Sequence, residues 1–246
     1  MSPLKRPIDH KKHLYSVHIT NEWSILQMKT IKTELVFILD RSGSMGGLES
    51  DTIGGFNSLL KKQQAEPGDC RITTVLFDDN YEILHDRIDI KAVKEITSQE
   101  YFVRGCTALL DAVGKTIKKI SKVQKNTADD YRAEKVMFVI TTDGMENASK
   151  EFTYDKIKSM VEKQKKKYNW EFIFLGANID AIDVANRFGI ARNRIQNFHN
   201  DSEGIALNYE VLNEAMMCFR ASPVEACLPD NWGDKISTNF KKRKSS

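Results

Sequence analysis

The hydrophobic pattern of the chain alternates between short continuous apolar runs and longer segments with helical spacing. Three continuous runs, each ending in a polar turn, are typical of strands buried on both faces of a sheet. They are residues 34–39 (ELVFIL), 136–141 (VMFVIT) and 170–175 (WEFIFL). A shorter strand is expected near residues 194–198.

A hairpin is predicted between the first two of these runs. Residues 71–77 (RITTVLF) and 81–90 (YEILHDRIDI) are separated by Asp78, Asp79 and Asn80, which we interpret as turn residues. The second run alternates between apolar and polar residues and is the more polar of the two. We therefore expect it to be an antiparallel strand at the edge of the sheet.

Between the strands, apolar residues recur with the spacing of amphipathic helices. Leu109, Val113 and Ile117, for example, fall on one stripe of a helix. The expected helices are residues 49–64, 108–123, 154–167, 180–188 and 203–218. Strands that alternate with helices in this way predict an α/β fold with a doubly wound, mostly parallel sheet.

Composition and charge narrow the class of protein. The chain has 246 residues, 41% of them hydrophobic and 29% charged, which is typical of a soluble globular protein and excludes disorder of the whole chain. Residues 33–218 hold 25 Lys and Arg against 29 Asp and Glu, whereas both ends are basic. We therefore expect a domain at 33–218, a basic extension at 1–32 and a basic tail at 219–246. A nucleic-acid-binding domain would show the opposite charge bias, so no nucleic-acid partner is expected.

The two basic ends allow more than one interpretation. The extension, with His10, His13 and His18, is interpreted as flexible and solvated rather than as a metal site, and Met28 is a second candidate for the start. Residues 241–244 (KKRK) are interpreted as solvated, with an acidic partner or a membrane surface as the alternative. No apolar stretch approaches the length of about 18 residues that suggests a membrane span, and the N-terminus lacks a signal-peptide core. We expect no membrane insertion and a cytoplasmic location.

The cysteines predict neither a disulfide framework nor a zinc site. Cys70, Cys106, Cys218 and Cys227 are widely spaced, with no C-x-x-C pair and no neighbouring histidine cluster. We interpret them as reduced and mostly buried thiols.

Polar side chains follow the ends of the predicted strands. Asp40, Ser42 and Ser44 come directly after residues 34–39, Thr107 precedes the helix at 108–123, and Asp143 follows residues 136–141. In doubly wound sheets, ligands bind beyond the carboxyl ends of the strands. The donors are all oxygen atoms, which suit Mg²⁺ or Mn²⁺ better than zinc. The sequence therefore predicts a divalent-metal site.

These residues carry a resemblance to a known family. Residues 33–218 resemble a von Willebrand factor type A (vWA) domain, most closely the stand-alone bacterial or phage type. D-R-S-G-S at 40–44, Thr107 and T-D-G at 142–144 match all three segments of that family's metal-ion-dependent adhesion site (MIDAS). The resemblance implies a complete MIDAS and a Rossmann-like sheet of order 3-2-1-4-5-6. Strand 3 would be antiparallel, and helices would flank both faces.

The resemblance also implies a role for each site residue. Ser42 and Ser44 would ligate the metal directly, while Asp40 would anchor bound waters and hold the two serines. Thr107 and Asp143 would contact the metal directly or through water. In this family an Asp or Glu carboxylate of a partner protein fills the remaining octahedral position. Hydroxyl ligands are neutral, so they leave the ion under-neutralised and attractive to that carboxylate.

Two residues beside the motifs have competing interpretations. Cys106 stands where many relatives have glycine; a small buried residue is favoured over an oxidation-sensitive thiol at the metal loop. Glu146 either lines the site or is a surface residue, and the surface is slightly favoured.

Enzymatic functions find little support in the sequence. Residues 42–46 (SGSMG) lack the first glycine of the G-x-S-x-G turn of hydrolases, and no phosphate-binding glycine loop is present. The expected function is a metal-dependent protein-binding module that is not an enzyme. A scaffold with a vestigial metal site and, less favoured, a Mg²⁺-assisted hydrolase are the alternatives. The pattern does not indicate the oligomeric state.

Overall fold

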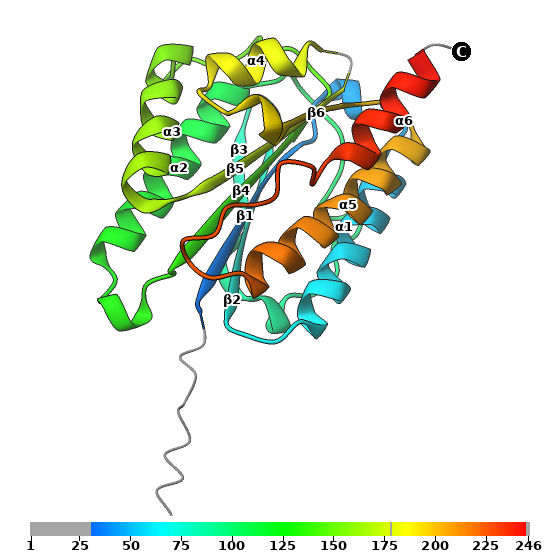
Figure 1. Ribbon diagram of the computed structural model, residues 1–246. Coiled ribbons are helices and arrows are strands. Elements are labelled where there is room, and N and C mark those ends of the chain that lie inside the picture. The colour runs from blue at the N-terminus through cyan, green and yellow to red at the C-terminus, as the bar shows by residue number, and fades with distance from the viewer. Residues whose placement is uncertain (1–30, 178, 245–246) are drawn as a thin grey trace, which may run out of the picture.

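A six-stranded sheet forms the centre of the computed structural model, which describes residues 31–177 and 179–244 (Figure 1). The strand order is β3-β2-β1-β4-β5-β6; β3 runs antiparallel to β2, and the other neighbouring pairs are parallel. The strands are β1 (Thr33–Asp40), β2 (Cys70–Phe77), β3 (Tyr81–Asp89), β4 (Lys135–Thr142), β5 (Glu171–Ala177) and β6 (Ile195–Phe198). The predicted topology is confirmed. The predictions for residues 1–30, including those for His10, His13, His18 and Met28, lie outside the described residues.

Helices cover both faces of the sheet, as expected for a doubly wound fold (Figure 1). On one face α1 packs against α5, and on the other α2 packs against α3. The helices are α1 (Glu49–Ala65), α2 (Leu109–Asn126), α3 (Tyr154–Tyr168), α4 (Ala181–Arg187), α5 (Ser202–Ala221) and α6 (Asp234–Lys244). Short 3₁₀ turns are η1 (Gly43–Met45), η2 (Ile90–Ala92), η3 (Asp129–Tyr131) and η4 (Arg192–Arg194).

The central strand β1 is buried along its whole length. Because successive side chains of a strand point to opposite faces, Leu35, Phe37 and Leu39 join the core on the α1 and α5 side. Val36 and Ile38 join the core on the α2 and α3 side. Each such fully buried side chain contributes roughly 1.5–3 kcal/mol of transfer free energy. A continuous apolar run is therefore what a strand in this position requires.

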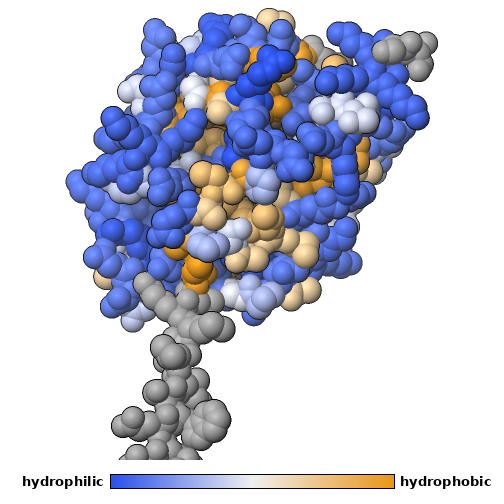
Figure 2. All heavy atoms as spheres, in the orientation of Figure 1, coloured by the Kyte–Doolittle hydropathy of each residue, from blue (hydrophilic) through white to orange (hydrophobic). Residues whose placement is uncertain are grey.

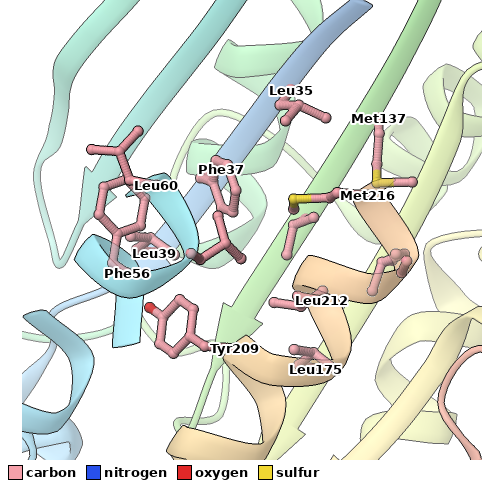
Figure 3. Close-up of a cluster of buried hydrophobic side chains, with 14 of the residues drawn as sticks. Leu35, Phe37, Leu39, Phe56, Leu60, Met137, Leu175, Tyr209, Leu212 and Met216 are labelled. Atoms are coloured by element: carbon pink, nitrogen blue, oxygen red, sulfur yellow. The ribbon is translucent and has the colours of Figure 1, made fainter. Parts of the chain in front are cut away.

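Figure 3 shows the core on the α1 and α5 side, where Phe37 of β1 faces Phe56 of α1 and Tyr209 of α5 lies close by. The rings of Phe37 and Phe56 meet edge to face, with centroids 5.4 Å apart. Leu212 and Met216 of α5 reach the same cluster one and two turns further along the helix. This packing fixes α5, and with it the loop that precedes α5, relative to the end of β1.

The compact part of the chain continues past residue 218, the end of the domain expected from the sequence. That residue lies inside α5, and the segment after α5 crosses in front of the sheet before α6 begins (Figure 1). Leu228 and Ile236 are buried in the core, where partly buried Trp232 packs against the same cluster. Figure 2 shows apolar surface in the middle of this view, where that segment crosses, between hydrophilic helices. The part of 219–246 that the structure describes is therefore packed onto the fold through these apolar residues, whereas Lys241, Lys242 and Lys244 are exposed, as expected for residues 241–244.

Candidate metal centre

The sheet brings the predicted site residues to one edge. The register pairs Leu39 of β1 with Leu76 of β2 and Thr141 of β4, so the carboxyl ends of these strands are level. Asp40 ends β1, and Asp143 follows β4 directly. The loop with Thr107 precedes α2 at the same edge.

Four of the five predicted residues form one continuous group of oxygen atoms. The Oγ atoms of Ser42 and Ser44 are 3.1 Å apart. Thr107 Oγ1 donates to Ser42 Oγ over 3.0 Å, and Ser44 Oγ donates to Asp143 Oδ1 over 2.5 Å. Three hydroxyls and one carboxylate, from three separate loops, are therefore joined in one hydrogen-bonded group.

Asp40 is buried beside this group and accepts a hydrogen bond from the backbone of Ser42. Its Oδ1 accepts a hydrogen bond from the Ser42 N–H over 2.7 Å, and its Oδ2 accepts one from Thr142 Oγ1 over 2.5 Å. The residue is only 2% exposed, and burial raises the pKa of Asp40 to about 6, although hydrogen bonds from Ser42 and Thr142 oppose that shift. Asp40 thus holds the backbone of the loop that carries Ser42 and Ser44, here called the serine loop.

The second carboxylate, Asp143, is also held from two sides. Ser44 donates to Oδ1, and Asn200 Nδ2 donates to Oδ2 over 2.8 Å. Burial raises the pKa of Asp143, and these two hydrogen bonds lower it in part. Asn200 follows β6 at the same edge of the sheet, a position that the sequence analysis did not use. A bound cation would favour the charged form of both Asp143 and Asp40.

The arrangement fits a small hard cation. Adjacent ligands of an octahedral Mg²⁺ site with bonds of about 2.1 Å are about 3 Å apart, close to the Ser42–Ser44 and Ser42–Thr107 separations. Gly144 leaves the necessary space, because a Cβ there would meet Thr107 Oγ1 at 2.7 Å and Ser44 Oγ at 3.0 Å. Within residues 31–177 and 179–244, no three His, Cys, Asp or Glu side chains gather to hold a metal. A metal at this position would therefore depend on the hydroxyls.

A network of ion pairs surrounds Arg41, which belongs to the serine loop. Arg41 is completely buried; its Nε donates to Asp78 Oδ2 over 2.9 Å, and its Nη2 donates to Glu82 over 2.7 Å. Arg104 Nε donates to the same Asp78 oxygen over 2.8 Å. Burial raises the pKa of Asp78, but the hydrogen bonds from Arg104, Asn80 and Arg41 outweigh it and lower the pKa to about 2. Asp78 is a turn residue, as predicted, and it also joins two loops of the centre.

The loop before Thr107 is held against the serine loop by backbone and aromatic contacts. The Arg104 N–H donates to the Arg41 carbonyl over 2.9 Å, and the Gly43 N–H donates to the Gly105 carbonyl over 3.1 Å. Phe102 lies under both guanidinium groups, at 5.2 Å from Arg41 and 5.1 Å from Arg104. Gly105 has φ +67°, and a Cβ there would meet Asp79 at 2.0 Å, so this tight approach requires glycine.

The loop after Asp143 also positions Thr107. Asn147 Oδ1 accepts a hydrogen bond from the Thr107 N–H over 2.9 Å. Glu146 is half-buried rather than a free surface residue, since it accepts hydrogen bonds from the Leu110 N–H over 2.8 Å and from Ser149. It thereby satisfies an N–H in the first turn of α2.

The cysteine predictions need a correction. Cys106, Cys218 and Cys227 are exposed, and only Cys70 is buried. The Cys106 side chain is exposed. The contacts that hold this loop to the serines are made by its backbone and by Thr107 instead. None of the four thiols forms a disulfide.

Comparisons with known proteins support the fold. No family model matches the chain, and no curated protein matches it. Similar solved structures include a D319A mutant of the PilB minor pilin from Streptococcus sanguinis, with TM-score 0.55 and 12% identity over 79% of this chain and 64% of the pilin. The vWF domain of the type V pili tip protein Mfa5 from Porphyromonas gingivalis has TM-score 0.53 and 12% identity over 80% of this chain and 99% of that domain.

A third similar structure is described with a metal. Proximal thread matrix protein 1 from the mussel byssus, with a zinc-occupied MIDAS motif, has TM-score 0.52 and 11% identity over 77% of this chain and 46% of that protein. The chain thus spans less than two thirds of the pilin and about half of the byssus protein. At these identities the likeness concerns the fold, which is that of vWA domains. In the part of the chain that the structure describes, no helix is long and apolar enough to cross a membrane.

Proposed function

We propose that the protein is a divalent-metal-dependent protein-binding module. Ser42, Ser44, Thr107 and Asp143 would hold the ion, and Asp40 would hold the serine loop and the waters bound beneath it. The observation that carries the proposal is the convergence of three hydroxyls and Asp143 in one hydrogen-bonded group. An Asp or Glu carboxylate of a partner protein would complete the coordination.

The charge of the donor set supports recognition of a carboxylate. Hydroxyl groups are neutral, so Asp143 supplies the one negative charge in the group of four. Asp40 holds the backbone of Ser42 instead of joining this group. A divalent ion held in this way retains part of its positive charge, and an incoming carboxylate neutralises it. Oxygen donors favour Mg²⁺ or Mn²⁺. The zinc in the byssus structure makes Zn²⁺ a third ion to compare.

The rim of the centre offers additional contact area to a partner. Met145 is 72% exposed and Phe102 is 40% exposed, and both belong to loops that contribute site residues. Exposed apolar side chains beside a polar anchor are typical of protein-binding surfaces. The pilus proteins among the similar structures agree with an interaction module.

Direct metal binding is the first test. We expect calorimetry to show one Mg²⁺ or Mn²⁺ per chain, and the Ser42→Ala/Ser44→Ala double variant to bind at least tenfold more weakly. Ser58→Ala, at an exposed position of α1, is the matched control and should bind as the wild type does. A wild type that binds no ion at about 10 mM would favour the vestigial scaffold instead. Partner capture that persists in EDTA would contradict recognition through the metal.

We further propose that the module is not an enzyme and acts in the cytoplasm. Ser44 donates to Asp143 rather than to a histidine. The described histidines contact other groups: His85 bonds Thr74, and His199 bonds the Phe240 carbonyl. Three exposed free thiols are typical of a reducing compartment. Fractionation of the native cell tests the location, and turnover of phosphoester or acyl substrates that Ser44→Ala abolishes would contradict the first statement.

A further inference from the structure

The fold places the candidate metal centre and an exposed acidic turn at opposite ends of one strand. At its carboxyl end, β4 runs directly into Asp143. A few residues before its amino end lies η3, which follows α2. Because β4 has eight residues, its two ends are roughly 25 Å apart. In Figure 1 the turn that follows α2 lies at the end of the sheet where β1 begins.

This turn, residues 128–131 and here called the acidic turn, is exposed and held in shape by its own contacts. All four residues are exposed. The Arg132 N–H donates to the Asp129 carbonyl over 3.3 Å, and the Arg132 guanidinium forms an ion pair with the Asp129 carboxylate at 2.9 Å. Arg132 Nη2 also donates to the Thr127 carbonyl over 2.9 Å. A turn that is already ordered loses little conformational freedom when it binds a partner.

One carboxylate of the acidic turn is unpaired. Asp129 is engaged by Arg132, whereas Asp130 forms no ion pair or side-chain hydrogen bond with any residue that the structure describes. A free carboxylate is the group that the metal centre lacks, because Asp143 is the one carboxylate among its four donors. Asp130 cannot reach the centre of its own chain from the other end of β4.

Exposed apolar side chains single out Asp130 from the other carboxylates. Six large apolar side chains are exposed among the described residues, and three of them have a carboxylate next to them in the chain: Ile88, Tyr131 and Met145.

Two of these three neighbouring carboxylates are already bonded. Asp89, beside Ile88, accepts a hydrogen bond from the Lys91 N–H over 3.0 Å. Glu146, beside Met145, accepts one from the Leu110 N–H over 2.8 Å. Only Asp130, beside Tyr131, combines a free carboxylate with an exposed ring in this comparison of the described residues.

The apolar surfaces at the two ends of the sheet also complement each other. Met145 and Tyr131, at 72% and 67%, are the most exposed of the six side chains. Met145 lies in the loop after Asp143, and Phe102, 40% exposed, lies on the other side of the centre in the loop before Thr107. A contact that brings Asp130 to the ion would place the adjacent Tyr131 against this rim. Tyrosine is among the residues that contribute most to protein interfaces.

We propose that the partner of the metal centre is a second copy of this chain, whose Asp130 supplies the carboxylate. The inference rests on the proposed function and names its partner. Tyr131 of the second copy would cover Met145 and Phe102. The two surfaces are different and lie at opposite ends of the sheet, so the contact is heterologous. It therefore repeats from copy to copy into an open chain or a ring instead of closing into a two-fold dimer.

Analytical ultracentrifugation of the full chain tests the proposal. In Mg²⁺ we expect the average mass to rise past that of a dimer at protein concentrations up to about 0.5 mM, where weak interfaces assemble, and to return to that of a monomer in EDTA. Asp130→Asn should stay monomeric in Mg²⁺, and Tyr131→Ala should assemble at least fivefold more weakly. Asp69→Asn is the matched control, because it removes another exposed carboxylate at the same end of the sheet and should assemble as the wild type does. Equal losses in Asp69→Asn and Asp130→Asn would show a non-specific charge effect and overturn the proposal.

A mixing experiment tests the direction of the contact. Asp130→Asn keeps the metal centre but lacks the carboxylate, whereas Ser42→Ala/Ser44→Ala lacks the centre but keeps the acidic turn. Each variant should be monomeric alone in Mg²⁺, and an equimolar mixture should form a 1:1 dimer that grows no further. A mixture that stays monomeric while the wild type assembles would overturn the proposal.

Calorimetry with Mg²⁺ on dilute wild-type protein separates this inference from the proposed function. If the wild type binds Mg²⁺ but stays monomeric at every concentration, the second copy is not the partner and the proposed function stands. If it neither binds Mg²⁺ nor assembles, both are overturned. Assembly that persists in EDTA or in Asp130→Asn would also overturn the head-to-tail contact.

Discussion

Asn200 donates a hydrogen bond from Nδ2 to Oδ2 of Asp143 over 2.8 Å, and so joins the loop before α5 to the candidate metal centre. The loop is held in turn by α6. His199 stacks on Phe240 with ring centroids 4.7 Å apart, and its Nε2 lies 3.1 Å from the Phe240 carbonyl oxygen. Arg243 forms an ion pair with Asp201, which caps α5. A chain of contacts therefore connects the C-terminal helix with the carboxylate of the centre.

The first prediction concerns Asn200. Asn200→Ala removes a donor that orients Asp143 without removing any proposed ligand. Substitutions of groups that orient metal ligands typically weaken metal affinity about 10–100-fold, and we expect a loss in that range. Calorimetry with Mg²⁺ and Mn²⁺ measures it. Asn186→Ala, at an exposed position of α4, is the control, and equal affinity in the two variants would rule out a role for Asn200.

Gly144 leaves space next to the hydroxyls of Thr107 and Ser44. A Cβ at Gly144 would come within 2.7 Å of Thr107 Oγ1, so Gly144→Ala should displace this hydroxyl and weaken metal binding at least tenfold. Gly54→Ala is the matched control, because a Cβ there meets nothing within 4 Å and lies in the middle of α1. That control should raise stability by about 0.5–1 kcal/mol and leave metal binding unchanged. Normal metal affinity in Gly144→Ala would place the ion elsewhere.

The third prediction concerns the buried carboxylate beneath the loops. The pKa of Asp78 falls to about 2 in the folded state, below its ordinary value of 3.8. The stability that Asp78 contributes is therefore present above about pH 4, and it is lost as the pH falls towards 2. Asp78→Asn removes one of the two carboxylates that pair with the buried Arg41 and leaves the half-exposed Glu82. It should therefore cost about 3 kcal/mol at pH 7, the lower end of the range for breaking a buried ion pair.

Urea unfolding at pH 7 and at pH 3 separates this effect from general acid denaturation. The difference in free energy of unfolding between wild type and Asp78→Asn should shrink at the lower pH. Asp79→Asn, one residue away and exposed, should change stability little at either pH. An equal difference at both pH values would mean that the Asp78 charge contributes nothing.

Much of the sheet could be predicted because its strands carry a local signal. The run at 34–39 is apolar from Leu35 to Leu39, as burial on both faces requires, and the more polar run at 81–90 became the edge strand β3. The five predicted site residues meet at one edge because each lies within a few residues of the end of a strand or the start of a helix. The fold and the grouping of these residues are therefore visible in short stretches of sequence.

The remaining contacts join segments that are distant in the chain, and no local pattern reveals them. Asn200 meets Asp143 across 57 positions, and Asp78 meets Arg41 across 37. The helix α6 was missed because its sequence, DKISTNFKKRK, buries only Ile236 and otherwise resembles a polar tail. Cys106 was expected to be a small buried residue but is exposed, because exposure in a tight loop depends on which way the backbone turns.

We expect α6 to influence the candidate metal centre through the ion pair between Arg243 and Asp201. Arg243 and Asp201 are 31% and 42% exposed as side chains, so breaking their ion pair should cost at most about 1 kcal/mol of stability. The same change releases the loop that carries Asn200, and we expect Arg243→Ala to weaken metal binding several-fold. Lys235→Ala breaks comparable pairs between α6 and Glu210 and Glu214 of α5, away from that loop. If both variants bind metal equally well, α6 only stabilises the fold and has no effect on metal binding. A loss confined to Arg243→Ala means that α6 holds Asp143 in place through Asp201 and Asn200.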